Sequence, residues 1–435
     1  MKWNAKRLPL LLILCLFTVT FFIYRDFGIR MILGFGVLGL FLAGEGAGRI
    51  LSRRPLALHP VRLAMAFLAA VITANFLRPD GRHNADTVSY IIAMLLCAGF
   101  VWLWEENDRE SRRILTVLLS AAGAMTAFVV LYLLFPEPVY GLLYPRLSPV
   151  AQHYFDYFLP HGYGLSLGGY TFTAYVIFGG IAVCWGRLAA AEKWDWRSAL
   201  WLGAIFLFGF AILTLGRRGE LLMAVALCAA MVLLLVTPRM RMVLLLGGTA
   251  AAVLGVWLFI RFLPQFKEID FLYRYVRTIE NLVNGYDFTS GRTGLFALAI
   301  EGFRSAPVFG IGFDQFHTLV NPLLTDIEGN VMQDAHNIYL QMLCETGIVG
   351  TVLTLAPMAW ILVTTFRSLL RARKQPGRPG VQPLTVSLLL QSYLLLLGVL
   401  DPTFQKLIFW CFYGISAMLL IVGMERCGFR KGGRR

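Results

Sequence analysis

Charged side chains are scarce in this sequence. Only 15% of its 435 residues are Asp, Glu, Lys or Arg, whereas 58% are hydrophobic. Ordinary soluble domains carry about a quarter charged residues, so this composition excludes that class. The mean hydropathy of +0.67 agrees. The sequence therefore predicts an all-α polytopic membrane protein.

Apolar runs long enough to cross a hydrocarbon core of about 30 Å are frequent. We find twelve, with centres near Leu14, Val37, Ala69, Leu96, Ala124, Phe178, Phe208, Ala229, Ala252, Val352, Leu390 and Ala417. No internal repeat or low-complexity tract divides the chain. We therefore expect about twelve transmembrane helices in a single membrane domain, residues 1–435. A large, partly helical loop at residues 263–335 joins spans nine and ten.

The distribution of positive charge predicts the topology, because Lys and Arg in short loops collect on the cytoplasmic side. Most of the 39 Lys and Arg lie in alternate connections, from residues 1–7 to the tail at Glu425, and Lys406 falls inside the last span. Both termini are thus predicted to be cytoplasmic and the 263–335 loop extracytoplasmic. The net charge of +14 then needs no nucleic acid to account for it. No small-residue cleavage site follows the first span, which we expect to remain as an anchor.

The 263–335 loop also lacks cysteine. Six of the seven cysteines fall in apolar spans and one in the tail, which predicts no disulfide bond. Neither His-x-x-His nor paired-carboxylate spacing occurs, so we predict no metal site and no cofactor. Some loop carboxylates could bind a cation, but such groups usually face water: Asp314, Asp326, Glu328 and Asp334.

Two adjacent arginines, Arg217 and Arg218, lie in the short outer loop GRRGE between spans seven and eight. This placement runs against the positive-inside bias, so another role is expected. A guanidinium is permanently charged and donates in a fork that suits phosphate. The next span begins here and adds the positive end of a helix dipole. The pair predicts a seat for a lipid diphosphate; the alternative is that both side chains only reach anionic headgroups.

An amphipathic helix is predicted in the 263–335 loop at residues 271–283, where apolar residues recur at helical spacing. Arg274 and Arg277 lie largely off the apolar face. One interpretation is a purely structural helix. In the other, the basic residues meet a lipid headgroup or a diphosphate.

A second helix is expected over residues 292–304, capped by Thr289 or Ser290 and followed by Pro307 and a glycine turn. Arg292 would lie in its first turn and Arg304 in its last. A cation in the first turn opposes the helix dipole. This argues that Arg292 is placed for a ligand.

The most informative segment is DAHNIYLQMLCETGIVG, which begins at Asp334 and enters the tenth span. Asp334 or Asn337 is expected to cap a helix on which Asn337, Gln341 and Glu345 form one polar stripe. Polar groups at a membrane boundary are costly and therefore suggest function. His336, with an ordinary pKa near 6.5, is the candidate general base.

These motifs together resemble the O-antigen ligase and O-antigen polymerase superfamily. The resemblance rests on the outer RRG, on SGRTGLFALAIEGF and GIGFDQF in the long loop, and on HNIYLQMLCETGIVG, and it is most specific over residues 211–350. It implies a metal-independent, inverting glycosyltransferase of the bacterial cytoplasmic (inner) membrane. The donor would be a glycan on undecaprenyl diphosphate and the acceptor a sugar hydroxyl on the outer face.

The resemblance also implies residue roles. Arg218 and Arg292 would bind the donor diphosphate, and His336 would deprotonate the acceptor. The family more often has Ser where this chain has Arg217, so which arginine of the pair contacts the diphosphate stays open. The candidate catalytic residues are His336 and Glu345, and the candidate substrate-binding residues are Arg217, Arg218, Arg292, Arg304, Asn337 and Gln341.

Two other functions suit part of this sequence pattern. A transporter or flippase of an envelope precursor also suits twelve spans, but transporters place ionisable groups near the bilayer midplane, and here they gather at span ends. A peptidoglycan-type glycan polymerase is the second alternative. Ligases and polymerases share the motifs above.

Overall fold

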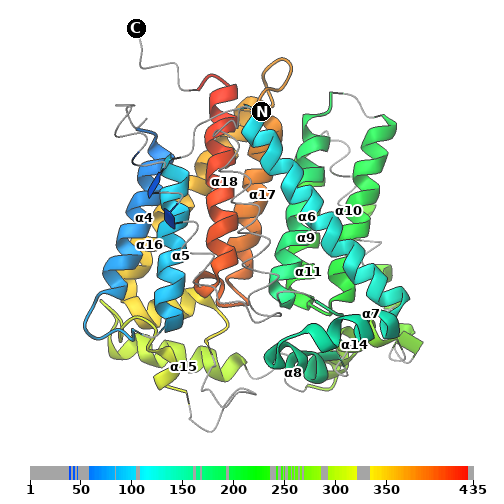
Figure 1. Ribbon diagram of the computed structural model, residues 1–435, viewed down its shortest axis with the longest axis horizontal. Helices are drawn as coiled ribbons and strands as arrows, with labels where there is room; N and C mark the ends of the chain where they lie inside the picture. The colour runs from blue at the N-terminus through cyan, green and yellow to red at the C-terminus, as the bar shows by residue number, and fades with distance from the viewer. Residues whose placement is uncertain are drawn as a thin grey trace. The chain divides into compact units, whose positions relative to one another are not determined.

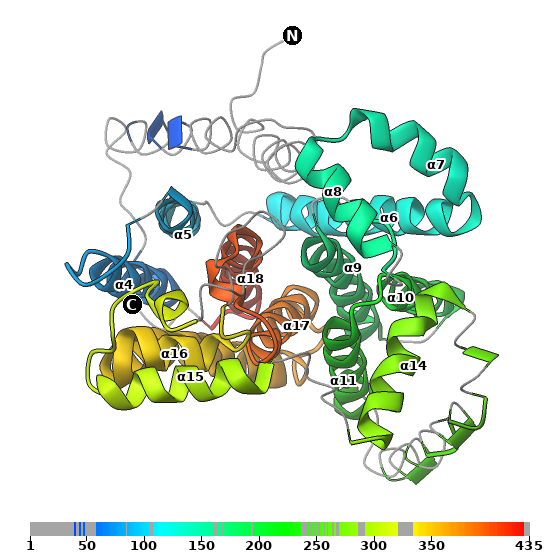
Figure 2. The ribbon, with the colours of Figure 1, turned by 90° about the horizontal axis from the view of Figure 1, so that it is seen from below.

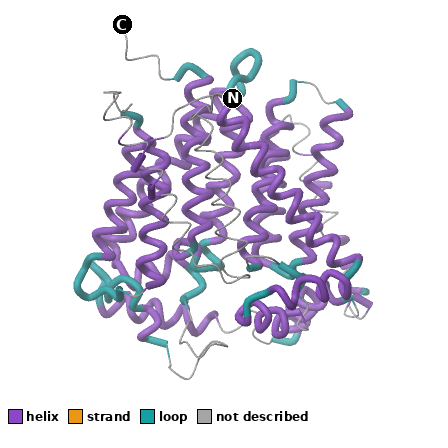
Figure 3. The backbone as a smooth tube through the Cα atoms, in the orientation of Figure 1, coloured by secondary structure: helices purple, strands orange, loops and turns teal. Residues whose placement is uncertain are grey.

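Every regular element in the described part of the chain is a helix. The computed structural model describes residues 58–83, 85–103, 108–159, 163–166, 169–192, 195–235, 269–285, 292–320 and 334–429, with isolated positions between 39 and 47 and between 242 and 266. No strand occurs among these residues (Figure 3). The predicted all-α class is confirmed.

Six helices of this part are long and apolar enough to cross a membrane, by length and composition. They are α6 (Asp108–Leu134), α9 (Tyr170–Ala190), α10 (Trp196–Thr214), α11 (Arg218–Leu235), α16 (Ile338–Ala372) and α18 (Leu407–Arg426). Shorter apolar helices accompany them: α4 (Pro60–Phe76), α5 (Ala85–Leu103) and α17 (Val381–Leu397). The chain is a multi-pass membrane protein.

Nine of the twelve predicted span centres lie inside these helices. The other three, near Leu14, Val37 and Ala252, fall outside the described residues. The count of twelve and the side on which each loop lies therefore stay predictions.

Both helices predicted in the 263–335 loop are confirmed. They are α14 (Asp270–Val283) and α15 (Arg292–Ser305), and the short turn η4 (Phe316–Thr318) follows. The expected cap of α15, at Thr289 or Ser290, lies outside the described residues.

The described residues form two compact units. Unit 1 takes its residues from Met31–Leu115 and Thr289–Arg435, and unit 2 from Thr116–Phe288. Unit 1 holds α4, α5, α15, α16, α17 and α18 (Figure 1). Unit 2 holds most of α6, then α7 (Pro136–Leu143), α8 (Pro149–Phe158), α9, α10, α11 and α14.

Unit 2 is built around α9, whose side chains are buried along nearly its whole length. Gly180 on this helix permits the close packing. A Cβ at position 180 would lie 2.4 Å from the Cβ of Ala122 on α6 and 2.8 Å from a ring carbon of Phe208 on α10. Any larger residue would therefore push the neighbouring helices away from α9.

In unit 1, α16 is interrupted at Gly347, where φ is 64° and ψ is −170°. A continuous helix would pair the amides of residues 348 and 349 with the carbonyls of residues 344 and 345. The interruption separates these four groups. Inside a bilayer each unpaired backbone group would cost several kcal/mol, so each needs another partner.

The segment 307–312, which follows α15, supplies those partners. Four backbone hydrogen bonds join it to α16: Ile311 N to Cys344 O (2.9 Å), Gly312 N to Glu345 O (3.0 Å), Ile348 N to Pro307 O (2.9 Å) and Val349 N to Val308 O (3.2 Å). The loop thus replaces the helical partners that the break removes. Packing of Leu295 and Ala299 with Cys344 places α15 alongside α16 (Figure 2).

Two glycines make this insertion possible. A Cβ at Gly310 would lie 2.3 Å from the carbonyl carbon of Glu345, and one at Gly347 would lie 2.3 Å from the carbonyl oxygen of Val308. Both also have positive φ, at 74° and 64°, which favours glycine. Arg78, which follows α4, also binds this segment by donating to the carbonyls of Phe309 and Gly310.

Replacement of Gly347 by alanine is expected to lower the stability of the protein by about 2 kcal/mol or more, because a left-handed alanine is strained and its Cβ meets Val308 O. The measurement is the thermal unfolding midpoint of the full-length protein in detergent. Gly294→Ala on α15 is the control, since nothing lies within 4 Å of a Cβ built there. Equal midpoints for the two variants would contradict the expectation.

Candidate functional site

The polar segment at the start of α16 is held in place by its cap. Asn337 accepts hydrogen bonds at its Oδ1 from the amides of Tyr339 and Leu340, each at 3.1 Å, so the predicted cap is confirmed. Ile338 N donates to Gly398 O at 2.8 Å. The Tyr339 hydroxyl donates to Leu395 O at 2.5 Å. The first turn of α16 is thereby anchored to the end of α17.

His336 directly precedes this cap. Its φ of 49° lies in the left-handed region, and the residue is half-buried. A non-glycine residue in that region costs of order 1–3 kcal/mol and is retained when the surroundings fix it. The anchored cap provides such surroundings. The imidazole is therefore presented from a defined backbone position.

Gln341 and Glu345 form the buried part of the predicted stripe, with 1% and 5% of their surface exposed. The Gln341 amide nitrogen donates to Glu345 Oε1 at 3.2 Å and to Asp334 Oδ1 at 3.4 Å. Its oxygen accepts from Ala335 N at 3.3 Å. Gln341 therefore links the residues before the helix to the carboxylate two turns into it.

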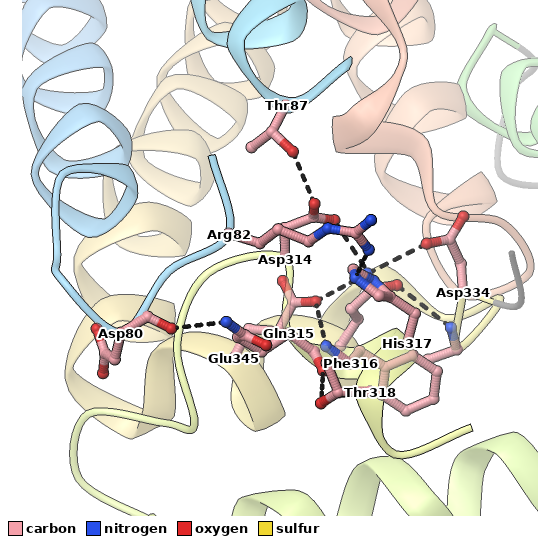
Figure 4. Close-up of polar contacts among 12 residues, drawn as sticks. Asp80, Arg82, Thr87, Asp314, Gln315, Phe316, His317, Thr318, Asp334 and Glu345 are labelled. Atoms are coloured by element: carbon pink, nitrogen blue, oxygen red, sulfur yellow. Dashed lines mark hydrogen bonds and ion pairs between the residues drawn. The ribbon is translucent and has the colours of Figure 1, made fainter. Parts of the chain in front are cut away.

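Glu345 also holds the segment that contains η4, because its Oε1 accepts from Phe316 N at 3.2 Å (Figure 4). Asp314 in that segment has a φ of 59° and accepts from the Thr87 hydroxyl at 2.7 Å. Sequence reasoning treated Asp314 as a solvated loop carboxylate. It lies instead next to Thr87 of α5 and His317 of its own segment.

Sequence reasoning missed a series of polar contacts that continues from Asp314. Arg82 donates to His317 Nε2, and His317 Nδ1 lies 3.8 Å from Asp314 Oδ1 (Figure 4). Because a guanidinium has donors only, Nε2 must accept and the proton of the neutral ring sits on Nδ1, toward Asp314. Burial lowers the pKa of His317, Asp314 opposes this, and Arg82 adds to it. The sequence signal for this cluster was that Arg82 shares the short loop between α4 and α5 with a second arginine, Arg78.

Arg292 reaches the same region from α15. Its guanidinium donates to Leu400 O at 2.9 Å, in the connection that also anchors the start of α16. Arg304 is exposed at the other end of α15, about 18 Å along the helix axis. The structure thus brings Arg292, but not Arg304, toward the His336 segment.

Lys406 and Asp401 lie in this connection too. The predicted place of Lys406 inside the last span is wrong, because the residue precedes α18 and forms an ion pair with Asp401. Burial raises the pKa of Asp334 to about 6, while Gln341 and Lys406 act against the rise. A carboxyl that titrates near neutrality therefore stands two residues before His336.

Arg217 and Arg218 lie in unit 2, at the turn between α10 and α11 where Gly216 has a φ of 70°. Arg217 donates to Glu220 Oε1 at 2.6 Å and to the Thr171 hydroxyl at 2.8 Å. Arg218 is the first residue of α11, as expected, and donates to the Thr278 hydroxyl of α14. The two adjacent guanidiniums are therefore held by different partners.

These observations define the class: a multi-pass, all-α membrane protein whose polar residues gather at the ends of its apolar helices. Residues 202–355 match the family described as O-antigen ligase. This match confirms the predicted resemblance over those residues. The matched part runs from α10 into α16 and includes Arg217, Arg218, Arg292 and the His336 segment. Comparison with curated proteins found no match.

Asp334→Asn is expected to stabilise the protein at pH 7 by about 1–2 kcal/mol. A raised carboxyl pKa means that the folded state binds the proton on Asp334 more tightly than the unfolded state does. The resulting stabilisation of the fold is fully present below pH 4 and is lost as pH rises through 6. Asparagine keeps the acceptor for Gln341 without the charge. Thermal midpoints between pH 4 and 8 test this, with Glu301→Gln on the exposed face of α15 as control. A wild-type and Asp334→Asn difference that does not grow with pH would refute the assignment.

Proposed function

We propose that the protein is a membrane glycosyltransferase that moves a glycan from undecaprenyl diphosphate to an acceptor sugar hydroxyl on the outer face of the bacterial cytoplasmic membrane. The observation that carries this proposal is the O-antigen ligase match over residues 202–355, because that region holds both polar groups described above. The matched family has a glycan-transfer role. For this protein we propose the lipid-diphosphate donor, the sugar acceptor and the mechanism described next.

In the proposed reaction His336 takes the proton of the acceptor hydroxyl. The freed oxygen attacks the anomeric carbon of the donor sugar and forms the new glycosidic bond. The bond from that carbon to the diphosphate breaks, and its electron pair leaves with the diphosphate. A single displacement of this kind inverts the anomeric configuration.

The arginines are proposed to stabilise the leaving group. Diphosphate leaves readily once its charge is neutralised, and guanidiniums can supply that electrostatic stabilisation without a metal. Arg218 and Arg292 take this role by resemblance. The ion pair of Arg217 with Glu220 favours Arg218 as the residue of the pair that contacts the diphosphate.

Glu345 and Gln341 are proposed to support the base. Glu345 is buried and its Oε1 already accepts from Phe316 N and Gln341, so its contacts favour a positioning role over direct proton transfer. Asn337 acts in the same way through the cap. Arg304, exposed and distant along α15, is the weakest of the proposed substrate-binding residues.

His336→Ala is expected to lower the rate of glycan transfer by about 10²–10⁴, the usual contribution of a general base. The assay incubates the purified protein with a lipid-diphosphate glycan and an acceptor and follows the products on gels. His153→Ala, in the exposed face of α8, is the matched control and should transfer at the wild-type rate.

Transfer that survives in His336→Ala would refute the mechanism. The same gels separate the two subclasses. A ladder of products indicates a polymerase, and a single transferred glycan indicates a ligase. Accumulation of the intact donor on the other side of vesicles, without transfer, would support the transporter alternative instead.

A further inference from the structure

The amphipathic helix α14 is joined to the turn between α10 and α11 by polar contacts. The Tyr275 hydroxyl donates to Leu213 O at 3.1 Å, and the Arg274 guanidinium donates to Gly216 O at 2.8 Å. From the other side Arg218 donates to Thr278 of α14. The helix α14 therefore packs against the turn that carries Arg217 and Arg218.

Arg274 is held from a second direction by Tyr163. Its guanidinium carbon lies 3.5 Å from the centroid of the Tyr163 ring, a cation–π geometry. The adjacent Gly164 lets this segment approach α10, since a Cβ there would lie 2.4 Å from Thr214 O. The guanidinium is thus fixed between an aromatic ring and a backbone carbonyl.

The positive charge at this turn exceeds the negative charge. Glu220 pairs with Arg217. Among the residues that the structure describes, the side chains of Arg218 and Arg274 contact only neutral groups. Burial, together with the charges of Arg218 and Arg217, lowers the pKa of Arg274 to about 10, although Tyr163 acts against the shift. Partly buried like charges destabilise one another unless an anion joins them.

We propose that Arg274 joins Arg218 in an anion site at this turn, with the Arg217–Glu220 pair beside it, and that this site takes a diphosphate group. The inference rests on the proposed function and deepens it by adding a residue and a helix to the donor site. Three guanidiniums less one carboxylate leave two positive charges, which suits a diphosphate better than a singly charged lipid headgroup. The first turn of α11 adds its helix dipole.

The arrangement also assigns a part to α14 as a whole. Thr278 accepts from Arg218 and donates to the carbonyl of Arg274 at 2.7 Å. One hydroxyl therefore links the Arg218 guanidinium to the backbone of Arg274, on the helix that carries the second guanidinium. Docking of α14 would set the spacing of the two, and hence the fit to two phosphate groups.

The test is the affinity of purified full-length protein in detergent for inorganic diphosphate, measured by calorimetry. Arg274→Gln is expected to weaken binding about tenfold, the loss of one charge-assisted contact. Arg274→Lys, which keeps the charge but not the fork, should weaken it about threefold. Inorganic phosphate should bind more weakly than diphosphate to the wild-type protein.

Arg277→Gln is the matched control, because Arg277 is an exposed arginine one turn further along α14. It should bind diphosphate like the wild type. Wild-type affinity in Arg274→Gln, or an equal loss in Arg277→Gln, would overturn the inference. If Arg274→Gln shows no cooperative thermal transition and is therefore unfolded, Arg274→Lys becomes the test variant. Wild-type diphosphate affinity in Arg274→Lys would then overturn the inference.

This outcome is separable from that of the proposed function. Diphosphate binding that depends on Arg274, in a protein that transfers no glycan, would refute the transferase and leave the anion site standing. Glycan transfer with undiminished diphosphate affinity in Arg274→Gln would refute only the role of Arg274.

Discussion

The break in α16 at Gly347 is the constraint on which the arrangement of unit 1 depends. It frees four backbone groups within an apolar helix, and the 307–312 segment pairs with all four. Because those bonds fix the segment, they also fix the residues that follow it. Asp314, Phe316 and His317 are thereby brought to the side of α16 that carries Glu345.

This way of satisfying the break bears on function. Discontinuous helices in transporters expose their free backbone groups to a substrate or ion near the bilayer midplane. In this protein the groups freed at Gly347 are occupied by the chain itself. The polar side chains Gln341 and Glu345 lie before the break, toward the start of α16, and they are tied to Asp334 and Phe316. The pattern suits chemistry at a helix end better than passage through the membrane.

The two polar groups differ in charge, and each has its own supporting helix. In unit 1, carboxylates are held by Gln341, Thr87 and backbone amides, and His336 is presented by the cap of α16. In unit 2, guanidiniums are held by hydroxyls, an aromatic ring and a carbonyl, with α14 as support. The carboxylates and His336 in unit 1 thus depend on hydrogen bonds within the chain. The arginines in unit 2 keep a surplus of positive charge.

Much of this was predictable because it depends on local pattern. Hydropathy located the apolar helices, helical spacing located α14, and cap residues with a following proline located α15. The Asn337 cap followed from residue type. Arg82, Thr87 and His317 were not predictable in this way. Arg82 is far in sequence from His317, and Thr87 is far from Asp314. These bonds form only when the segments after α4 and α15 meet.

The sequence by itself determined the membrane class, nine of the apolar helices and the candidate residues His336, Arg292 and the Arg217–Arg218 pair, since composition, residue type and position in the chain suffice for these. Only the tertiary structure decided which polar groups meet. It separated Arg304 from Arg292, gave Glu345 its amide partners and brought Arg274 to the arginine pair. The physical reason is that backbone pairing at Gly347 and the docking of α14 are long-range contacts, and no local pattern encodes them.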